Sequence, residues 1–417
     1  MFKDPIEFSK KDLFLQWFLV ISILMVPFFH YGEVLALLDG SIHNQVTLNT
    51  ALPVIIFKYV LVLAIAVLAF AMCKFPRVSF SSVENWGVVV LFGMSAFAVL
   101  MTDNLGVWSF LAGCRWLLPF YLVFFFIPLI DKALIEKLAY ASILMMVLNC
   151  IMQLWELAYM SPWWGLLAGT HFAARVPGLF PVPSTSAMFT CFAALLSFFV
   201  IEEKRMKWLI ATVAMFSVFL TLSGTGFGAM LVILGTLASG SRWRICFPVI
   251  VPVSYELTKL VMPYFRGEGY FQVSLGGRED MLSGMSGMSG ISNWSDLAQS
   301  LFGANFGAGT ATAWLLKFNY SIDTHPVMTD SLLAQLVVNL GGIALLGYLL
   351  LMSVAALLAY ISDKQLAVLW LIVTGFFSIT APITEAFPLN IMLAVAIAYL
   401  IRTRCFSFES PLRWQGA

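Results

Sequence analysis

Long apolar runs recur from one end of this 417-residue chain to the other, and they restrict the folds open to it. Each run covers roughly 17 to 25 residues, the length that an α-helix needs to cross a hydrocarbon core of about 30 Å. Hydrophobic residues make up 61% of the chain and charged residues only 11%, far from the shares usual in a soluble domain. A membrane β-barrel would alternate apolar and polar residues instead. The sequence therefore predicts an all-α polytopic integral membrane protein.

The runs divide into about twelve expected transmembrane spans. They lie near residues 13–29, 52–73, 86–102, 107–130, 138–160, 184–201, 207–222, 226–239, 245–262, 331–358, 366–383 and 388–401. Residues 1–262 then carry nine spans with short loops, 263–330 form a large outer loop, and 331–417 carry three spans and a short tail. We expect the first run to be a retained anchor, because no small-x-small cleavage site follows it before His43 and Asn44.

The distribution of basic residues sets the expected orientation. With both termini in the cytoplasm, sixteen of the 23 Lys and Arg residues fall on the cytoplasmic side, as the positive-inside rule requires. The seventh and eighth spans are short and meet at Ser223–Gly226, where glycines end or break a helix. They are either two crossings or a re-entrant hairpin, and both return the chain to the cytoplasmic side.

The other seven basic residues all fall in outer loops or in the outer halves of spans. They are Lys58, Arg115, Arg175, Lys259, Arg266, Arg278 and Lys317. Acidic residues share this level: Glu156, Glu256 and Glu385. We interpret the set as an outward-facing, net basic cavity suited to a lipid-linked anion, since ionisable groups inside a membrane usually face water or a partner.

Simpler readings stay open for several of these residues. Glu256 and Lys259 have the i, i+3 spacing of an ion pair on one helix. Lys58 is placed where its side chain can snorkel to the outer headgroups, and Arg266 where it can anchor at the interface. Arg115 is about 10 Å deep and flanked by Trp116 and Leu117, so snorkelling is harder there.

Composition also argues against other classes of partner. The net charge is +1 and no Lys/Arg-rich run is present, so nothing suggests nucleic acid. None of the six cysteines falls in an expected outer loop, and no disulfide framework or metal site is expected. Within the large outer loop, Met281–Ile291 repeats Met-Ser-Gly, a composition typical of a tether.

Five short motifs follow one another in and around the outer segments. The first is Arg175-Val-Pro-Gly178-Leu-Phe180, before a span. Next come Leu222–Gly228 and the Gly-Gly-Arg278 element of the large loop. The glycine-rich stretch Leu301–Gly309 follows, and then His325–Leu333, which leads into a helix with Asn339-Leu-Gly341-Gly342.

The order of these motifs resembles the superfamily of Wzy-type O-antigen polymerases and O-antigen ligases, over roughly residues 160–350. Ligases of that superfamily carry His-Asn at the start of the last motif's helix. Asp330-Ser331 occupies that place here, and His325 lies five residues earlier, which favours a polymerase over a ligase.

The resemblance implies a GT-C-like, metal-independent glycosyltransferase of a bacterial inner membrane that uses no cofactor. It would move a glycan from undecaprenyl diphosphate to the next lipid-linked repeat unit on the periplasmic face, among membrane lipids and with a chain-length regulator as a further partner. By match to the motifs, Arg175 and Arg278 would bind the donor diphosphate, with Arg115 and Lys58 added from their depth alone.

The same resemblance calls for a general base on the acceptor hydroxyl, for which His325 and Asp330 are the candidates. A solvated loop histidine and a helix N-cap are the simpler readings of these two residues. A glycan ligase, a lipid-linked oligosaccharide flippase or transporter, and a structural membrane subunit are the alternative functions.

Overall fold

The computed structural model describes residues 10–25, 83–102, 105–127, 130–159, 175–180, 182–266, 300–303, 305–310, 312–313, 316–317, 321–322, 324, 331–386 and 388–402. Within these ranges every regular element is helical. The α-helices are α1 (Lys10–Leu24), α5 (Val83–Met101), α6 (Val107–Phe126), α7 (Lys132–Tyr159), α9 (Pro183–Phe198), α10 (Lys204–Thr221), α11 (Gly224–Ser239), α12 (Trp243–Arg266), α16 (Leu332–Ile361), α17 (Gln365–Thr380) and α18 (Leu389–Arg402). One 3-10 turn, η1 (Gly240–Arg242), joins α11 to α12. The all-α prediction is confirmed for this part of the chain.

Four stretches of the described chain are long and apolar enough to cross a membrane. They are Val107–Phe124, Lys132–Ala158, Gly224–Phe265 and Leu332–Ile361. Large apolar side chains also face outward, among them Leu346, Leu350 and Leu351 of α16, each 67% exposed. In water such a surface would be unfavourable, so the helices are those of a multi-pass membrane protein.

Eleven of the twelve expected spans coincide with a helix, and the remaining one, 52–73, lies outside the described residues. The largest shift is at α7, which begins at Lys132 rather than near residue 138. Its first turns are polar and carry an exposed pair, with Lys132 Nζ 3.8 Å from Glu136 Oε1. Hydropathy does not detect such turns, because a helix continues into water where its side chains are charged.

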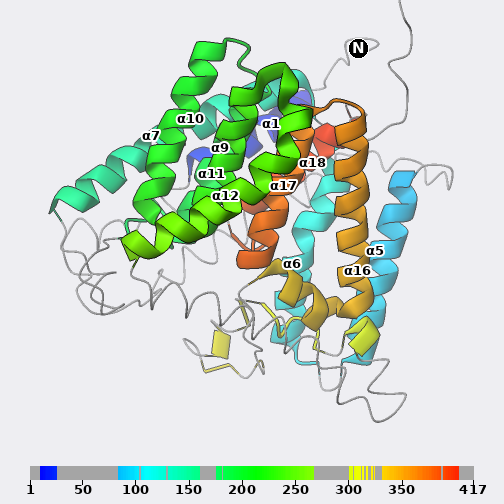
Figure 1. The fold of residues 1–417 in the computed structure, drawn as a ribbon. Helices are drawn as coiled ribbons and strands as arrows, with labels where there is room; N and C mark the ends of the chain where they lie inside the picture. The colour runs from blue at the N-terminus through cyan, green and yellow to red at the C-terminus, as the bar shows by residue number, and fades with distance from the viewer. Residues whose placement is uncertain are drawn as a thin grey trace, which may run out of the picture.

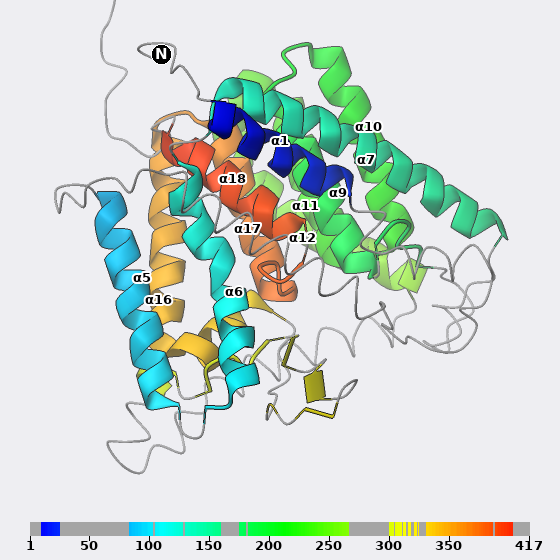
Figure 2. The same cartoon turned by 180° about the vertical axis from the view of Figure 1, so that it is seen from behind.

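The helices form two groups joined by a central pair (Figures 1 and 2). Helices α7, α9, α10, α11 and α12 lie on one side, α5, α6 and α16 on the other, and α17 and α18 lie between them. Helix α9 is the most enclosed, and the ring of its Phe192 lies 4.9 Å from that of Trp370 and 5.9 Å from that of Phe377 on α17.

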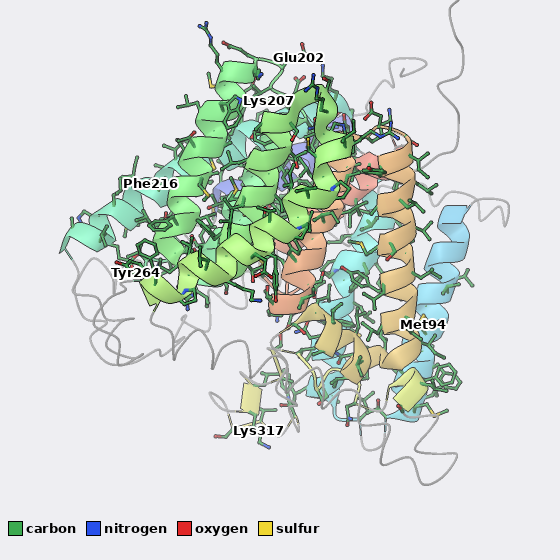
Figure 3. The ribbon with its side chains drawn as sticks, in the orientation of Figure 1. Met94, Glu202, Lys207, Phe216, Tyr264 and Lys317 are labelled. Atoms are coloured by element: carbon green, nitrogen blue, oxygen red, sulfur yellow. The ribbon has the colours of Figure 1, made fainter. Side chains whose placement is uncertain are left out.

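The bundle has two distinct ends. Figure 3 places Glu202 and Lys207 at one end and Lys317 at the opposite one. Helix α10 begins at the Lys207 end and ends at Thr221. The next residue, Leu222, has a left-handed backbone (φ 47°). The Ser223 hydroxyl then caps α11 by accepting a hydrogen bond from Gly226 N at 3.3 Å. At about 27 and 24 Å, α10 and α11 are each somewhat shorter than a hydrocarbon core of about 30 Å.

The glycine-rich stretch after residue 300 is docked into the bundle by its glycines. Helix α16 is broken at Gly341 (φ 81°), and Gly303 (φ 83°) packs on the Asn339 backbone just before that break. Gly307 (φ 85°) lies against Ser109 of α6, where a β-carbon would overlap the Ser109 carbonyl oxygen. At these three positions the backbone is left-handed and there is no space for a β-carbon. Only glycine meets both conditions.

Replacing Gly307 by Ala should therefore destabilise the protein, by about 2 kcal/mol or more, through left-handed strain and overlap with α6. Gly347→Ala is the matched control, because no atom lies within 4 Å of a β-carbon added there. Thermal unfolding of the purified protein in detergent measures both variants. Equal melting temperatures for the two would contradict the docking described here.

Candidate functional site

Arg115, one of the deep basic residues predicted from the sequence, lies in the middle of α6 and is held by two other segments. Its Nη1 donates to the Thr312 hydroxyl and lies 3.6 Å from Glu385 Oε1, while Nη2 donates to the Glu385 carbonyl oxygen at 3.4 Å. The arginine side chain is 22% exposed and that of Glu385 is 4% exposed. Two charges predicted to share the outer level of the membrane are thus an ion pair.

Further donors converge on the Glu385 carboxylate. Gln335 Nε2 of α16 donates to Oε2 at 2.6 Å, and the Thr312 hydroxyl and backbone N–H donate to Oε1 at 3.2 and 3.4 Å. Gln335 in turn accepts a 2.8 Å bond from the Trp116 indole N–H. We call Arg115, Trp116, Thr312, Gln335 and Glu385 the arginine–glutamate cluster; it joins α6, α16, the segment after residue 300 and the α17–α18 connection.

One turn further along α16, Asn339 extends this cluster to the glycine-rich stretch. Its Nδ2 donates to the Gln335 carbonyl oxygen at 2.8 Å, and its Oδ1 accepts the Gly307 N–H at 2.7 Å. Gln335 and Asn339 are each 0% exposed. The glycine-rich stretch after residue 300 is therefore fixed by side-chain hydrogen bonds as well as by close glycine packing.

The segment that holds His325 and Asp330 lies outside the described residues, but both of its flanks are anchored. Thr324 donates from its hydroxyl to the Ala313 carbonyl oxygen at 2.6 Å, and its own carbonyl oxygen accepts from Ser109 Oγ at 3.3 Å. On the other side, Leu332 N donates to the Ala381 carbonyl oxygen at 3.1 Å. Both flanks are thus held beside the elements of the arginine–glutamate cluster.

The reading of Asp330 as the N-cap of the following helix is wrong. Helix α16 begins at Leu332, and its N-cap is Ser331, whose hydroxyl accepts the Ala334 N–H at 3.1 Å. Serine is as good a cap as aspartate, and its short side chain reaches the third amide of the helix. The cap position is therefore filled without Asp330.

Arg175 and the turn after it are held in a second place, against α7 and α10. Arg175 Nε donates to the Thr221 carbonyl oxygen at 3.2 Å, and Val176 N donates to the Leu220 carbonyl oxygen at 3.2 Å. We call residues 175–180 the Arg175 turn. Gly178 within it has a φ of 67°, a conformation that favours glycine.

Three polar side chains of α7 hold the other side of this turn. Glu156 Oε2 accepts the Gly178 N–H at 3.0 Å, Asn149 Oδ1 accepts the Leu179 N–H at 2.9 Å, and Gln153 Nε2 donates to the Val176 carbonyl oxygen at 3.1 Å. All three are 0–1% exposed.

Two serines complete this arrangement: Asn149 donates to Ser186 Oγ at 3.0 Å, and Ser217 Oγ donates to Gln153 Oε1 at 2.7 Å. Ser186 and Ser217 come from α9 and α10, so the α7 side chains are oriented by two further helices.

The structure describes some of the site residues predicted from the sequence and not others. Arg115 is joined to Glu385 and Arg175 to the end of α10, whereas Lys58, Arg278, His325 and Asp330 lie outside the described residues. Glu256 and Lys259 form the expected i, i+3 ion pair on α12, at 3.5 Å. Within the described part of the chain, no group of three or more His, Cys, Asp or Glu side chains is arranged to hold a metal ion.

Sequence reasoning missed the amides of both clusters. Asn149, Gln153 and Glu156 recur at i, i+4 and i+7, and Gln335 and Asn339 at i and i+4, so each set lies on one helix face. Several buried polar groups on one face of an apolar span are unfavourable unless they bond to one another or to backbone. That spacing is the sequence signal that could have identified both the arginine–glutamate cluster and the polar side chains under the Arg175 turn.

Breaking the arginine–glutamate pair should destabilise the protein more than removing it altogether. Glu385→Ala leaves Arg115 without its carboxylate in a largely enclosed place, so we expect a loss of about 2 kcal/mol or more. The same change in an Arg115→Ala background should have a smaller effect, with a coupling energy of about 1–3 kcal/mol. Thermal unfolding of the two single variants and the double variant in detergent measures this coupling; strict additivity would argue against the pair.

No family model, curated protein or solved structure matches the chain. The resemblance to O-antigen polymerases and ligases therefore stands on the quoted motifs alone.

Proposed function

We propose that the protein is a repeat-unit polymerase of bacterial surface polysaccharide. It would transfer a glycan from undecaprenyl diphosphate to the next lipid-linked repeat unit, on the periplasmic face of the inner membrane. The proposal includes about twelve spans in a GT-C-like arrangement with both termini in the cytoplasm. It assigns no metal or cofactor to the reaction.

One observation carries this proposal: the two described residues that flank positions 325–330 are bonded to elements that carry the arginine–glutamate cluster. Thr324 is bonded to Ser109, six residues before Arg115, and Leu332 is bonded to Ala381, four residues before Glu385. In the sequence, the candidate bases His325 and Asp330 lie between Thr324 and Leu332, two described residues bonded to the elements that carry Arg115 and Glu385. Glycosyl transfer from a diphosphate needs these two functions together, a base for the acceptor and a cation for the leaving group.

The Arg175 turn supports the same assignment. Arg175 is bonded to the end of α10 that lies away from Lys207, and the helix separates Lys207 from Thr221 by about 21 Å. Buried hydrogen bonds fix the backbone around it, and a preorganised arginine suits an anionic leaving group because no reorganisation is needed during reaction. We assign Arg175 and Arg278 to the donor diphosphate, with Arg115 and Lys58 in supporting roles.

The charge distribution supports an outward-facing site. Figure 3 labels Lys207 at this end, where α10 begins, and Figure 1 shows the α11–α12 and α16–α17 connections at the same end. In the sequence these helix termini carry Lys204, Arg205, Arg242, Arg244 and Lys364. There Arg244 Nη2 donates to the Ile361 carbonyl oxygen at 3.4 Å and Gln365 Nε2 donates to the Thr236 carbonyl oxygen at 3.1 Å. By the positive-inside rule we assign this end to the cytoplasm and Arg175 to the periplasmic side.

Alternative functions differ in what they require. A glycan ligase would use the same donor site and differ only in its acceptor. A flippase or transporter would need charged groups through the full depth of its route, because the headgroup must pass both leaflets. The arginine–glutamate cluster and the Arg175 turn instead have backbone and side chains held by buried hydrogen bonds, which suits catalysis better than passage.

Complementation of a strain that lacks this gene tests the assignment of Arg175. With Arg175→Ala we expect surface glycan that carries single repeats instead of long polymer, because charge on the leaving diphosphate is no longer neutralised. Arg205→Ala, an exposed arginine at the opposite end, is the matched control and should give wild-type polymer. The measurement is glycan length on a gel, at equal protein abundance in the membrane.

Other results of this assay would exclude the proposal. Wild-type polymer from both Arg175→Ala and Arg278→Ala would exclude the diphosphate site. Full-length polymer that accumulates on its lipid carrier would identify a ligase, and lipid-linked repeats retained at the cytoplasmic face would identify a flippase.

Exchanging the charges of the cluster separates a catalytic role of Arg115 from a structural one. Arg115→Glu combined with Glu385→Arg keeps an ion pair but moves the cation to the α17–α18 connection. We expect the double variant to recover membrane abundance relative to either single change, while polymer stays short because the guanidinium group has moved. Recovery of wild-type glycan length would show that Arg115 acts only through the pair.

A further inference from the structure

We propose that Asn149, Gln153 and Glu156 are positioning residues for the diphosphate site, acting through the Arg175 turn. This inference rests on the proposed function, because it assumes that Arg175 binds the donor diphosphate. It adds that the geometry of the arginine is set by α7, a helix that carries none of the residues assigned to the substrate.

The side chains of α7 match the backbone groups of the Arg175 turn one to one. Glu156 accepts from Gly178 N, Asn149 accepts from Leu179 N, and Gln153 donates to the Val176 carbonyl oxygen. Three side chains on one helix face thus bind three backbone groups within four consecutive residues. Each hydrogen bond restricts the backbone of the turn, and together the three bonds fix the path of the chain just after Arg175.

The Arg175 turn also packs closely on α7. A β-carbon at Gly178 would lie 2.8 Å from Gln153 Cγ and 2.9 Å from the Asn149 carbonyl oxygen, so the turn lies directly on α7. On its other side, Val176 N is bonded to Leu220 and Arg175 Nε to Thr221. The guanidinium group is consequently placed relative to both α7 and α10.

Packing of the helices alone would not require these three polar side chains. Apolar side chains pack helices together without any buried hydrogen bonds, so a carboxylate and two amides are not needed for cohesion. Binding of an anion, by contrast, depends on where the guanidinium group lies, and a misplacement of about 1 Å at such a site costs on the order of 100-fold in rate. Positioning therefore explains why these polar groups lie under this turn.

Glu156 gives the sharpest test, because its two properties are separable. Glu156→Gln keeps a side-chain oxygen to accept the Gly178 N–H and removes the charge, whereas Glu156→Ala removes the acceptor. Ser142→Ala is the matched control on the same helix, since the Ser142 hydroxyl is 0% exposed and has no hydrogen-bond partner. All variants are made in the full chain and purified in detergent.

The measurement is the Kd for inorganic diphosphate, obtained from the concentration dependence of the thermal stabilisation. A role limited to stability would lower the melting temperature of the unliganded protein and leave this Kd unchanged. We expect Glu156→Ala to raise the Kd about tenfold or more, and Glu156→Gln to stay within about threefold of the wild type. Ser142→Ala should bind as the wild type does. In an Arg175→Ala background, Glu156→Ala should add nothing.

The outcomes separate the inference from the function on which it rests. If Arg175→Ala weakens binding and Glu156→Ala does not, the positioning role is wrong while the diphosphate site stands. If Glu156→Ala weakens binding further after Arg175 has been removed, the glutamate acts independently of the arginine and the inference is also wrong. Failure of the wild-type protein to bind diphosphate would overturn both.

Discussion

Hydrogen bonding between buried polar side chains and the backbone of irregular segments is the constraint on which the rest of this structure depends. Inside an apolar bundle, no water is at hand to satisfy a carboxylate or an amide, so every such group must find a protein partner. The Arg175 turn and the segment after residue 300 both have irregular backbone. Amides and a carboxylate of α7 hold the first, whereas Asn339 of α16 and Glu385 of the α17–α18 connection hold the second. Both irregular segments are thus held within the bundle by side-chain hydrogen bonds.

The two clusters solve this problem in different ways. Around the Arg175 turn, the acidic group accepts a backbone N–H from an adjoining segment of the chain. In the arginine–glutamate cluster, the carboxylate accepts from an amide, a hydroxyl and a backbone N–H while it pairs with Arg115. The first arrangement fixes a turn, whereas the second joins four segments at one ion pair. Loss of one member of the second should consequently be felt in every segment that it joins.

Hydropathy and charge were sufficient to predict most of the helices, because crossing a membrane demands a long apolar run whatever the tertiary structure. They also placed Arg115 and Glu385 at one level of the membrane. The contacts within this cluster could not be predicted, because they join residues that are far apart in the sequence. Trp116 and Gln335, for example, are separated by 219 residues. Asn149 and Gln153 were missed for another reason: an average over a window hides two amides among many apolar neighbours, although their spacing of four residues marks a common face.

The break at Gly341 divides α16 into two parts with different surroundings. Nearly all of its buried residues, Gln335 and Asn339 among them, precede or adjoin the break, while the outward-facing leucines follow it. An unbroken helix transmits a change of tilt along its whole length, but an interrupted hydrogen-bond ladder does not. The break therefore lets the second part of α16, which bonds to α17 through Tyr348 and Ser378 at 2.7 Å, take a direction that its polar first part does not set.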